Sequence, residues 1–247
     1  MDKAVAAREI ILLDALREAR QAALAAGIEI VALKGAALLE LGIYQPGERG
    51  MTDADVLVRP GDLAHFEKIL RELGYQAMPD SADAWFKPSG GAAPPAILDL
   101  HTGLWHIKGT DELFKWGLEP GPEGLALNLP DLFLHAAAHP LLHHGELTPK
   151  NLEDCARVAL HAPGDGEKFW AAVARKAAGY KMRAVLWPII TRLNAGPLNI
   201  PASALAGLEP RGLEKVKAAF FEKAALKHST FLEYLLPALQ RPALAAR

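Results

Sequence analysis

The sequence contains a single cysteine, Cys155, among its 247 residues. One cysteine cannot form an intramolecular disulfide or a zinc site built from several thiolates. No run of about 18 apolar residues occurs, so no membrane span is expected. The formal net charge is only −2, which disfavours a polybasic surface for membranes or long nucleic acids. Charges scattered through the first residues are not typical of a signal peptide, and we expect a cytoplasmic protein.

The hydrophobic pattern divides the chain into two parts of different character. The first part mixes β-branched runs, typical of buried strands, with amphipathic helical patterns. We predict strands at 28–35, 53–60 and 96–104, one or two short strands within 75–87, and helices at 3–26, 36–44 and 62–75. Only helical patterns follow, at 131–145, 151–162, 166–180, 182–195 and 213–239. The sequence therefore predicts an α/β domain at 1–128 and a helical domain at 129–247.

Two carboxylates one residue apart lie in an apolar run at 51–58. In an extended strand, Asp53 and Asp55 point to the same face, where their charges repel and are costly to bury without a partner. A divalent cation with oxygen ligands removes that cost. If the strand that carries Asp99 lies alongside, three carboxylates converge, as a two-metal site requires. An aspartate before such a run is also common as a strand-end or turn residue, and this structural interpretation stays open.

An anion site is indicated upstream of the two carboxylates. Lys34 and Gly35 stand where a predicted strand ends and a helix begins. Such a junction offers free backbone N–H groups and the positive end of the helix dipole. Glycine lets a phosphate approach closely, and the lysine adds a charge. This combination is typical of metal-assisted transfer from a nucleoside triphosphate.

The segment ALKGAALLELGIYQPGERGMTDADVLVRP resembles the signature of the uncharacterised nucleotidyltransferase family, within the DNA polymerase β-like nucleotidyltransferase superfamily. The resemblance continues with Leu-Gly-Tyr at 73–75 and with Asp-Leu-His at 99–101. It extends into the helical half through the histidine-rich helix and Asp154, and so spans about residues 30–160.

The resemblance implies an α+β fold: a polymerase β-like α/β domain with a mixed sheet, followed by an all-helical domain. It implies transfer of a nucleoside monophosphate from an NTP such as ATP to a hydroxyl-type acceptor, with release of pyrophosphate. Mg²⁺ is the implied cofactor, with Mn²⁺ as an alternative. Asp53, Asp55 and Asp99 would be the catalytic residues and metal ligands. Lys34, Gly35 and Arg49 would lie at the phosphates of the NTP.

The histidines allow more than one interpretation. His135, His139 and His143 are spaced by four residues and share a helix face, which would suit a transition-metal site. Pro140 disturbs that helix. For His139 and His143, contacts with the substrate or with the ligating carboxylates are favoured over metal binding, and a plain structural role is the main alternative. His101 beside Asp99 is a further candidate for such contacts.

Two other functions stay open. The chain could be a catalytically silent binding module that keeps the fold. It could also be a small-molecule phosphotransferase, because DLHTG at 99–103 is similar to a stretch of aminoglycoside and choline kinases. However, no glycine-rich phosphate loop of the kinase kind occurs, and no Gly-Lys-Ser/Thr follows GERG at 47–50. The acceptor is not encoded in the pattern, but the near-neutral charge favours a small molecule or a protein over a long nucleic acid.

Overall fold

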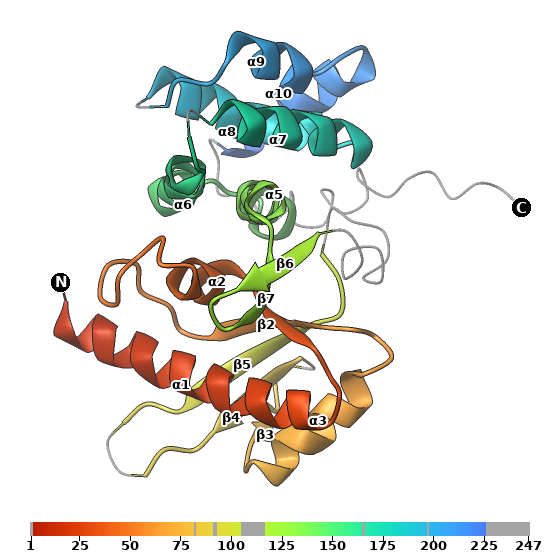
Figure 1. Cartoon of the computed structure of the whole chain (residues 1–247). Helices are drawn as coiled ribbons and strands as arrows, with labels where there is room; N and C mark the ends of the chain where they lie inside the picture. Colours follow the sequence, from red (N-terminus) through yellow and green to blue (C-terminus); the bar gives the residue numbers. More distant parts are fainter. Residues whose placement is uncertain are drawn as a thin grey trace, which may run out of the picture. The chain divides into compact units, whose positions relative to one another are not determined.

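The computed structural model describes residues 2–81, 83–90, 93–104, 117–164, 166–196 and 198–225 (Figure 1). The chain divides into two compact units, Met1–Asn128 and Leu129–Arg247. Within the described ranges, no helix combines the length and the hydropathy needed to cross a membrane.

The first unit is built on a five-stranded sheet. The strands are β1 (Ile30–Ala32), β2 (Ala54–Val58), β3 (Gln76–Ala77), β4 (Ala84–Lys87) and β5 (Ala96–His101). Their order across the sheet is β1-β2-β5-β4-β3, and every neighbouring pair is antiparallel except β2 and β5. The predicted α+β fold with a mixed sheet is therefore confirmed.

The parallel pair lies in the middle of this sheet. All five residues of β2 are buried, whereas β5 alternates buried and half-buried residues. The alternation leaves Leu98 and Leu100 in the core and turns Asp99 and His101 to the opposite face, because successive side chains of a strand point to opposite sides. The sheet thus carries polar groups on one face of its central strands.

Among the described residues of the first unit, three helices accompany the sheet: α1 (Lys3–Ala25), α2 (Lys34–Glu40) and α3 (Leu63–Glu72). Helix α1 begins where the Asp2 side chain accepts hydrogen bonds from the amides of Ala4 and Val5, a typical N-cap. It runs across the sheet (Figure 1) and contacts β2, β5, α2 and α3. Its buried stripe includes Leu12 and Leu16, at the spacing expected of an amphipathic helix.

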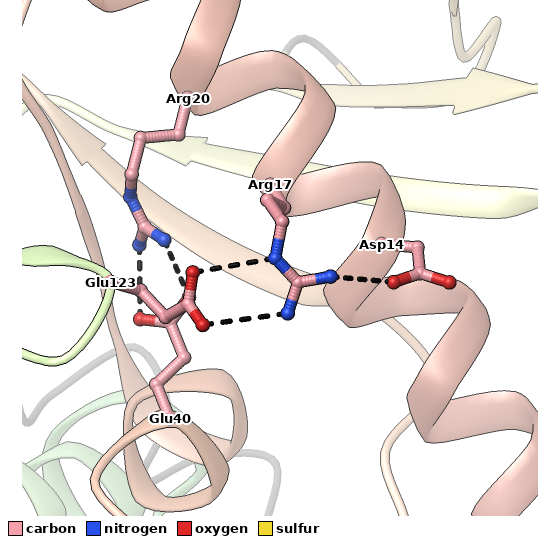
Figure 2. A network of polar contacts seen from close by, with 5 residues as sticks. All are labelled: Asp14, Arg17, Arg20, Glu40 and Glu123. Carbon is pink, nitrogen blue, oxygen red and sulfur yellow. Dashed lines mark hydrogen bonds and ion pairs between the residues drawn. The ribbon is translucent and has the colours of Figure 1, made fainter.

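A hairpin of β6 (Leu118–Gly121) and β7 (Gly124–Leu127) completes the unit. Figure 2 shows how charged residues connect it to the helices. Arg20 of α1 donates two hydrogen bonds to Glu40 of α2, at 2.7 and 2.9 Å; Arg20 is buried and Glu40 is largely covered. Arg17 lies beside them and pairs with Glu123 of the hairpin and with Asp14, in a more exposed position.

The second unit is helical in its described residues. Its helices are α5 (Leu129–His139), a π-helical turn η1 (Pro140–His144), α6 (Pro149–His161), α7 (Glu167–Gly179), α8 (Arg183–Ala195), α9 (Ala202–Leu208) and α10 (Leu213–Ala225). Phe133 of α5 packs edge-on against Phe169 and Trp170 of α7, with ring centroids 5.7 and 5.2 Å apart. The buried Asp131 accepts a 2.6 Å hydrogen bond from Lys176, which ties the same two helices together.

The elements differ from the predicted ones mainly at their ends. The strand predicted at 28–35 stops at Ala32, and Lys34 and Gly35 are the first residues of α2. The hairpin β6–β7 and helix α9 were not predicted, because they are short and have no strong periodicity. Residues 226–239 of the last predicted helix lie outside the described residues.

The largely buried pair of Arg20 and Glu40 leads to a prediction about stability. Glu40→Gln leaves the Arg20 guanidinium buried without a counter-charge, and breaking a buried pair in this way costs about 3–5 kcal/mol. Asp14→Asn removes only the exposed partner of Arg17, so it should change stability by no more than about 1 kcal/mol. Scanning calorimetry should therefore show a much larger drop in Tm for Glu40→Gln. Equal small shifts in both variants would show that the pair does not stabilise the first unit.

Candidate metal centre

The register of β2 and β5 brings two aspartates side by side. Asp55 pairs with Asp99 across the parallel ladder, and Leu57 pairs with His101. Residues opposite one another in a ladder point to the same face of the sheet, so both carboxylates lie on one side. Asp55 is buried and Asp99 is partly exposed. The structure thus brings together two of the three predicted carboxylates.

Two basic side chains neutralise the buried carboxylate. The His101 Nε2 atom lies 2.8 Å from Asp55 Oδ1 and 3.4 Å from Asp99 Oδ2. The Lys34 ammonium donates a hydrogen bond to the same oxygen of Asp55. The resemblance places Lys34 at the phosphates of an NTP, and in the structure it contacts one of the predicted metal ligands.

The backbone explains why Lys34 reaches Asp55. The Leu33 amide donates a 2.9 Å hydrogen bond to the Asp55 carbonyl, which continues the β1–β2 pairing beyond the strand. The next residue, Lys34, has a φ of 46°, in the left-handed region that residues other than glycine rarely adopt. This turn starts α2 directly beside the buried carboxylate. Such strained backbone is concentrated at functional sites in proteins.

Burial and neighbouring charges shift the acid–base properties of the site. Burial alone would raise the pKa of Asp55, but the His101 hydrogen bond and the Lys34 charge outweigh it and hold that pKa below its usual range. Burial and the negative charge of Asp55 raise the pKa of Asp53. Burial would lower the pKa of His101, but its hydrogen bonds to Asp55 and Asp99 dominate and raise this pKa to about 9.

Asp55, Asp99 and His101 form a group that could hold a metal ion. Each offers one ligand atom, and these atoms lie within 4.8 Å of one another. Oxygen ligands lie roughly 2.0–2.6 Å from Mg²⁺ or Ca²⁺, so one cation fits between the three atoms. Asp53 precedes β2 and is not a member of this group, although the charges of Asp55 and Asp99 influence its pKa. The chemistry of the donor set therefore suits a divalent cation.

The other two predicted phosphate residues lie against each other. A Cβ atom on Gly35 would overlap the guanidinium of Arg49 and would come within 3.4 Å of the Met51 sulfur. A Cβ atom here would displace the end of the flexible Arg49 side chain, so the glycine lets the guanidinium lie directly against the backbone. The loop between α2 and β2 thus brings Arg49 onto the start of α2, next to Lys34.

The histidine-rich segment belongs to the second unit. The rings of His139 and His143 stack with their centroids 5.0 Å apart, and His135 lies 5.5 Å from His139. The α-helix ends at His139, and a π-helical turn starts at Pro140, whose missing N–H interrupts the α-helical bonding. Among the described residues these histidines are not part of a group that could hold a metal ion. Contact of His139 and His143 with a substrate stays a prediction.

Two residues of α1 that no sequence motif marked contact the loop before β2. Arg8 donates to the Thr52 and Pro95 carbonyls, and Glu9 accepts from the amides of Gly47 and Gly50. One signal was available: Glu9 falls three residues before Leu12 and seven before Leu16, on the apolar stripe of the helix. A charged residue at such a position must find buried partners.

The fold and the site define an α+β protein with a candidate carboxylate–imidazole metal centre. The family model described as uncharacterised nucleotidyltransferase matches residues 2–195. The protein belongs to this family, which confirms the resemblance seen in the sequence. No curated protein matches the chain. The crystal structure of JHP933 from Helicobacter pylori is similar to it, with 14% identity, coverage of 98% of this chain and 100% of that chain, and a TM-score of 0.43.

The contacts of His101 predict its titration in the metal-free protein. Its pKa of about 9, above the ordinary 6.5, means that its charge stabilises the fold below about pH 6.5. This contribution is lost as the pH rises through about 9. NMR titration of the imidazole should show the raised pKa, and Asp55→Asn should lower it more than Asp99→Asn, because Asp55 lies closer. A His101 pKa at or below 6.5 would contradict the described pairing.

Proposed function

We propose that the protein is a metal-dependent nucleotidyltransferase that moves a nucleoside monophosphate from an NTP to a hydroxyl-type acceptor and releases pyrophosphate. The observation that supports this most is the juxtaposition of Asp55, Asp99 and His101 in a protein of a nucleotidyltransferase family. We also propose that residues 1–128 form the nucleotidyltransferase domain and that residues 129–247 form a helical domain. A cytoplasmic location and a small-molecule or protein acceptor belong to the same proposal.

The positions and charges of the side chains indicate which would bind the metal ion and which would bind the phosphates. Asp55 and Asp99 would hold Mg²⁺, or Mn²⁺ as an alternative, with Asp53 close by. His101 would become a third ligand once its Nε2 atom has released its proton, because only the neutral imidazole binds a metal. When bound, such an ion neutralises triphosphate oxygens and lowers the pKa of a bound hydroxyl group. Asp99 is partly exposed, so it can also accept the proton of the acceptor hydroxyl. Arg49 and Lys34 place positive charge beside the start of α2, where the phosphates of the NTP would be held.

Lys34 must then change its partner. Its ammonium and the imidazole of His101 both contact Asp55 Oδ1, and a metal ion would compete with them for this oxygen. A triphosphate offers the lysine a new partner of higher negative charge, so the two ligands would bind more tightly together than apart. Positioning and charge stabilisation of this kind carry most of the acceleration in phosphoryl transfer.

The contact between Lys34 and Asp55 also favours one alternative function. If Lys34 remains paired with Asp55 when an NTP and Mg²⁺ are present, the site is closed to metal and the chain is a catalytically silent binding module. The phosphotransferase alternative has no structural feature of this kind in its favour. Product analysis separates it from nucleotidyl transfer, because a kinase yields a nucleoside diphosphate and a nucleotidyltransferase yields pyrophosphate.

Ligand binding tests the proposal without knowledge of the acceptor. With Mg²⁺ present, at least one of the four common NTPs should raise the Tm, because a ligand at 100 times its Kd stabilises the folded state by about 2.7 kcal/mol. Asp55→Asn, Asp99→Asn and the Asp53→Asn/Asp55→Asn double variant should lose the Mg²⁺-dependent part of NTP binding in calorimetry. Asp14→Asn, an exposed carboxylate of α1, is the matched control and should bind as the unmodified protein does.

Two results would count against the proposal. No stabilisation by any NTP with Mg²⁺ would favour the silent module. Unchanged Mg²⁺-dependent binding in the Asp55 and Asp99 variants would show that these carboxylates do not hold the metal.

A further inference from the structure

The loop of residues 47–50, which carries Arg49, is hydrogen-bonded to helix α1. Its backbone has a left-handed conformation at Gly47 and Gly50, with φ of 91° and 71°, which glycine adopts without strain. These turns aim two amide N–H groups at a single side chain, Glu9. The Glu9 oxygens accept from Gly47 N at 2.5 Å and from Gly50 N at 2.7 Å. Arg49 lies between the two anchored positions.

Glu9 is fully buried although it is charged. A buried carboxylate is tolerated when hydrogen bonds replace the water that it has lost. Hydrogen bonds from backbone amides to a carboxylate are charge-assisted and stronger than those between neutral groups. The two bonds therefore fix the backbone on both sides of Arg49 more firmly than an apolar contact would.

The fixed loop places the side chain of Arg49 against Gly35. The guanidinium of Arg49 fills the space that a Cβ atom on Gly35 would need. A small shift of the loop would move this group away from the start of α2. Residues that hold a contacting group in place affect binding even though they never touch the ligand.

We propose that Glu9 is a positioning residue of the nucleotide site: its carboxylate holds the loop of residues 47–50 so that Arg49 lies over Gly35 and faces the triphosphate. This inference rests on the proposed function, because it needs a triphosphate at the start of α2. It assigns to α1, a helix without any predicted site residue, a part in recognition of the phosphates.

A double-mutant cycle tests the inference. The affinity for inorganic tripolyphosphate with Mg²⁺ is measured by calorimetry for the unmodified protein, Glu9→Gln, Arg49→Gln and the double variant. A glutamine keeps the size of Glu9 but turns an NH₂ group toward one of the two amides, so one hydrogen bond is lost. Glu9→Gln should bind about tenfold more weakly, as is common when a supporting partner is removed. Arg49→Gln removes the contacting charge itself and should weaken binding at least as much. The double variant should bind no more weakly than Arg49→Gln alone, because Glu9 acts through Arg49.

A second variant and a control separate this role from a general loss of stability. Gly50→Ala strains the same loop at a positive φ and leaves the carboxylate in place, so it should give the same cycle with Arg49→Gln even if Glu9→Gln fails to fold. Asp131→Asn removes another fully buried carboxylate, from the second unit. It should lower the Tm and leave the tripolyphosphate affinity unchanged.

The possible outcomes distinguish failure of the positioning role of Glu9 from failure of the proposed function. Additive losses from Glu9→Gln and Arg49→Gln, or an unchanged affinity in either single variant, would overturn the positioning role and leave the proposed function standing. Failure of the unmodified protein to bind tripolyphosphate with Mg²⁺ would overturn both. Weaker binding in both single variants, with no further loss in the double variant, would establish the role of Glu9.

Discussion

The site depends on the parallel pairing of β2 with β5. This register places Asp55 opposite Asp99 and brings His101 to the same face. A slip of one residue would turn Asp99 and His101 into the core and Leu98 and Leu100 out of it, because side chains alternate along a strand. The burial of the two leucines therefore fixes the position of the candidate ligands. The packing of the sheet and the chemistry of the site follow from one constraint.

The second constraint is electrostatic. A buried carboxylate beside two others requires positive charge, and the chain supplies it through Lys34 and His101. The same need can be met by a metal ion. In the proposed function, a metal ion competes with Lys34 and His101 for Asp55 Oδ1, so occupation of the site by an ion would favour release of Lys34 toward the phosphates. A site that exchanges one counter-charge for another would couple metal binding to nucleotide binding, and a site that cannot exchange them would be silent.

Strong local sequence patterns predicted much of the fold and part of the candidate site. The mixed sheet, the helical second half and the closeness of Asp55 to Asp99 followed from strand patterns and from the resemblance. The ends of elements did not, because Lys34 starts a helix through a left-handed turn that no propensity scale anticipates. The partner of Lys34 could not be predicted either, since it depends on the Leu33–Asp55 backbone hydrogen bond. Glu9 was missed because its partners are backbone amides far along the chain, which have no side-chain signature.

The central claim is that Asp55, Asp99 and His101 surround a divalent cation. Anomalous diffraction from crystals soaked in Mn²⁺ tests it most directly, since Mn²⁺ prefers the ligands of Mg²⁺ and is visible by its own scattering. The account predicts an anomalous peak within coordination distance of all three side chains, with the Lys34 ammonium moved away from Asp55. A crystal at saturating Mn²⁺ with no peak there, and with Lys34 still bound to Asp55, would contradict it.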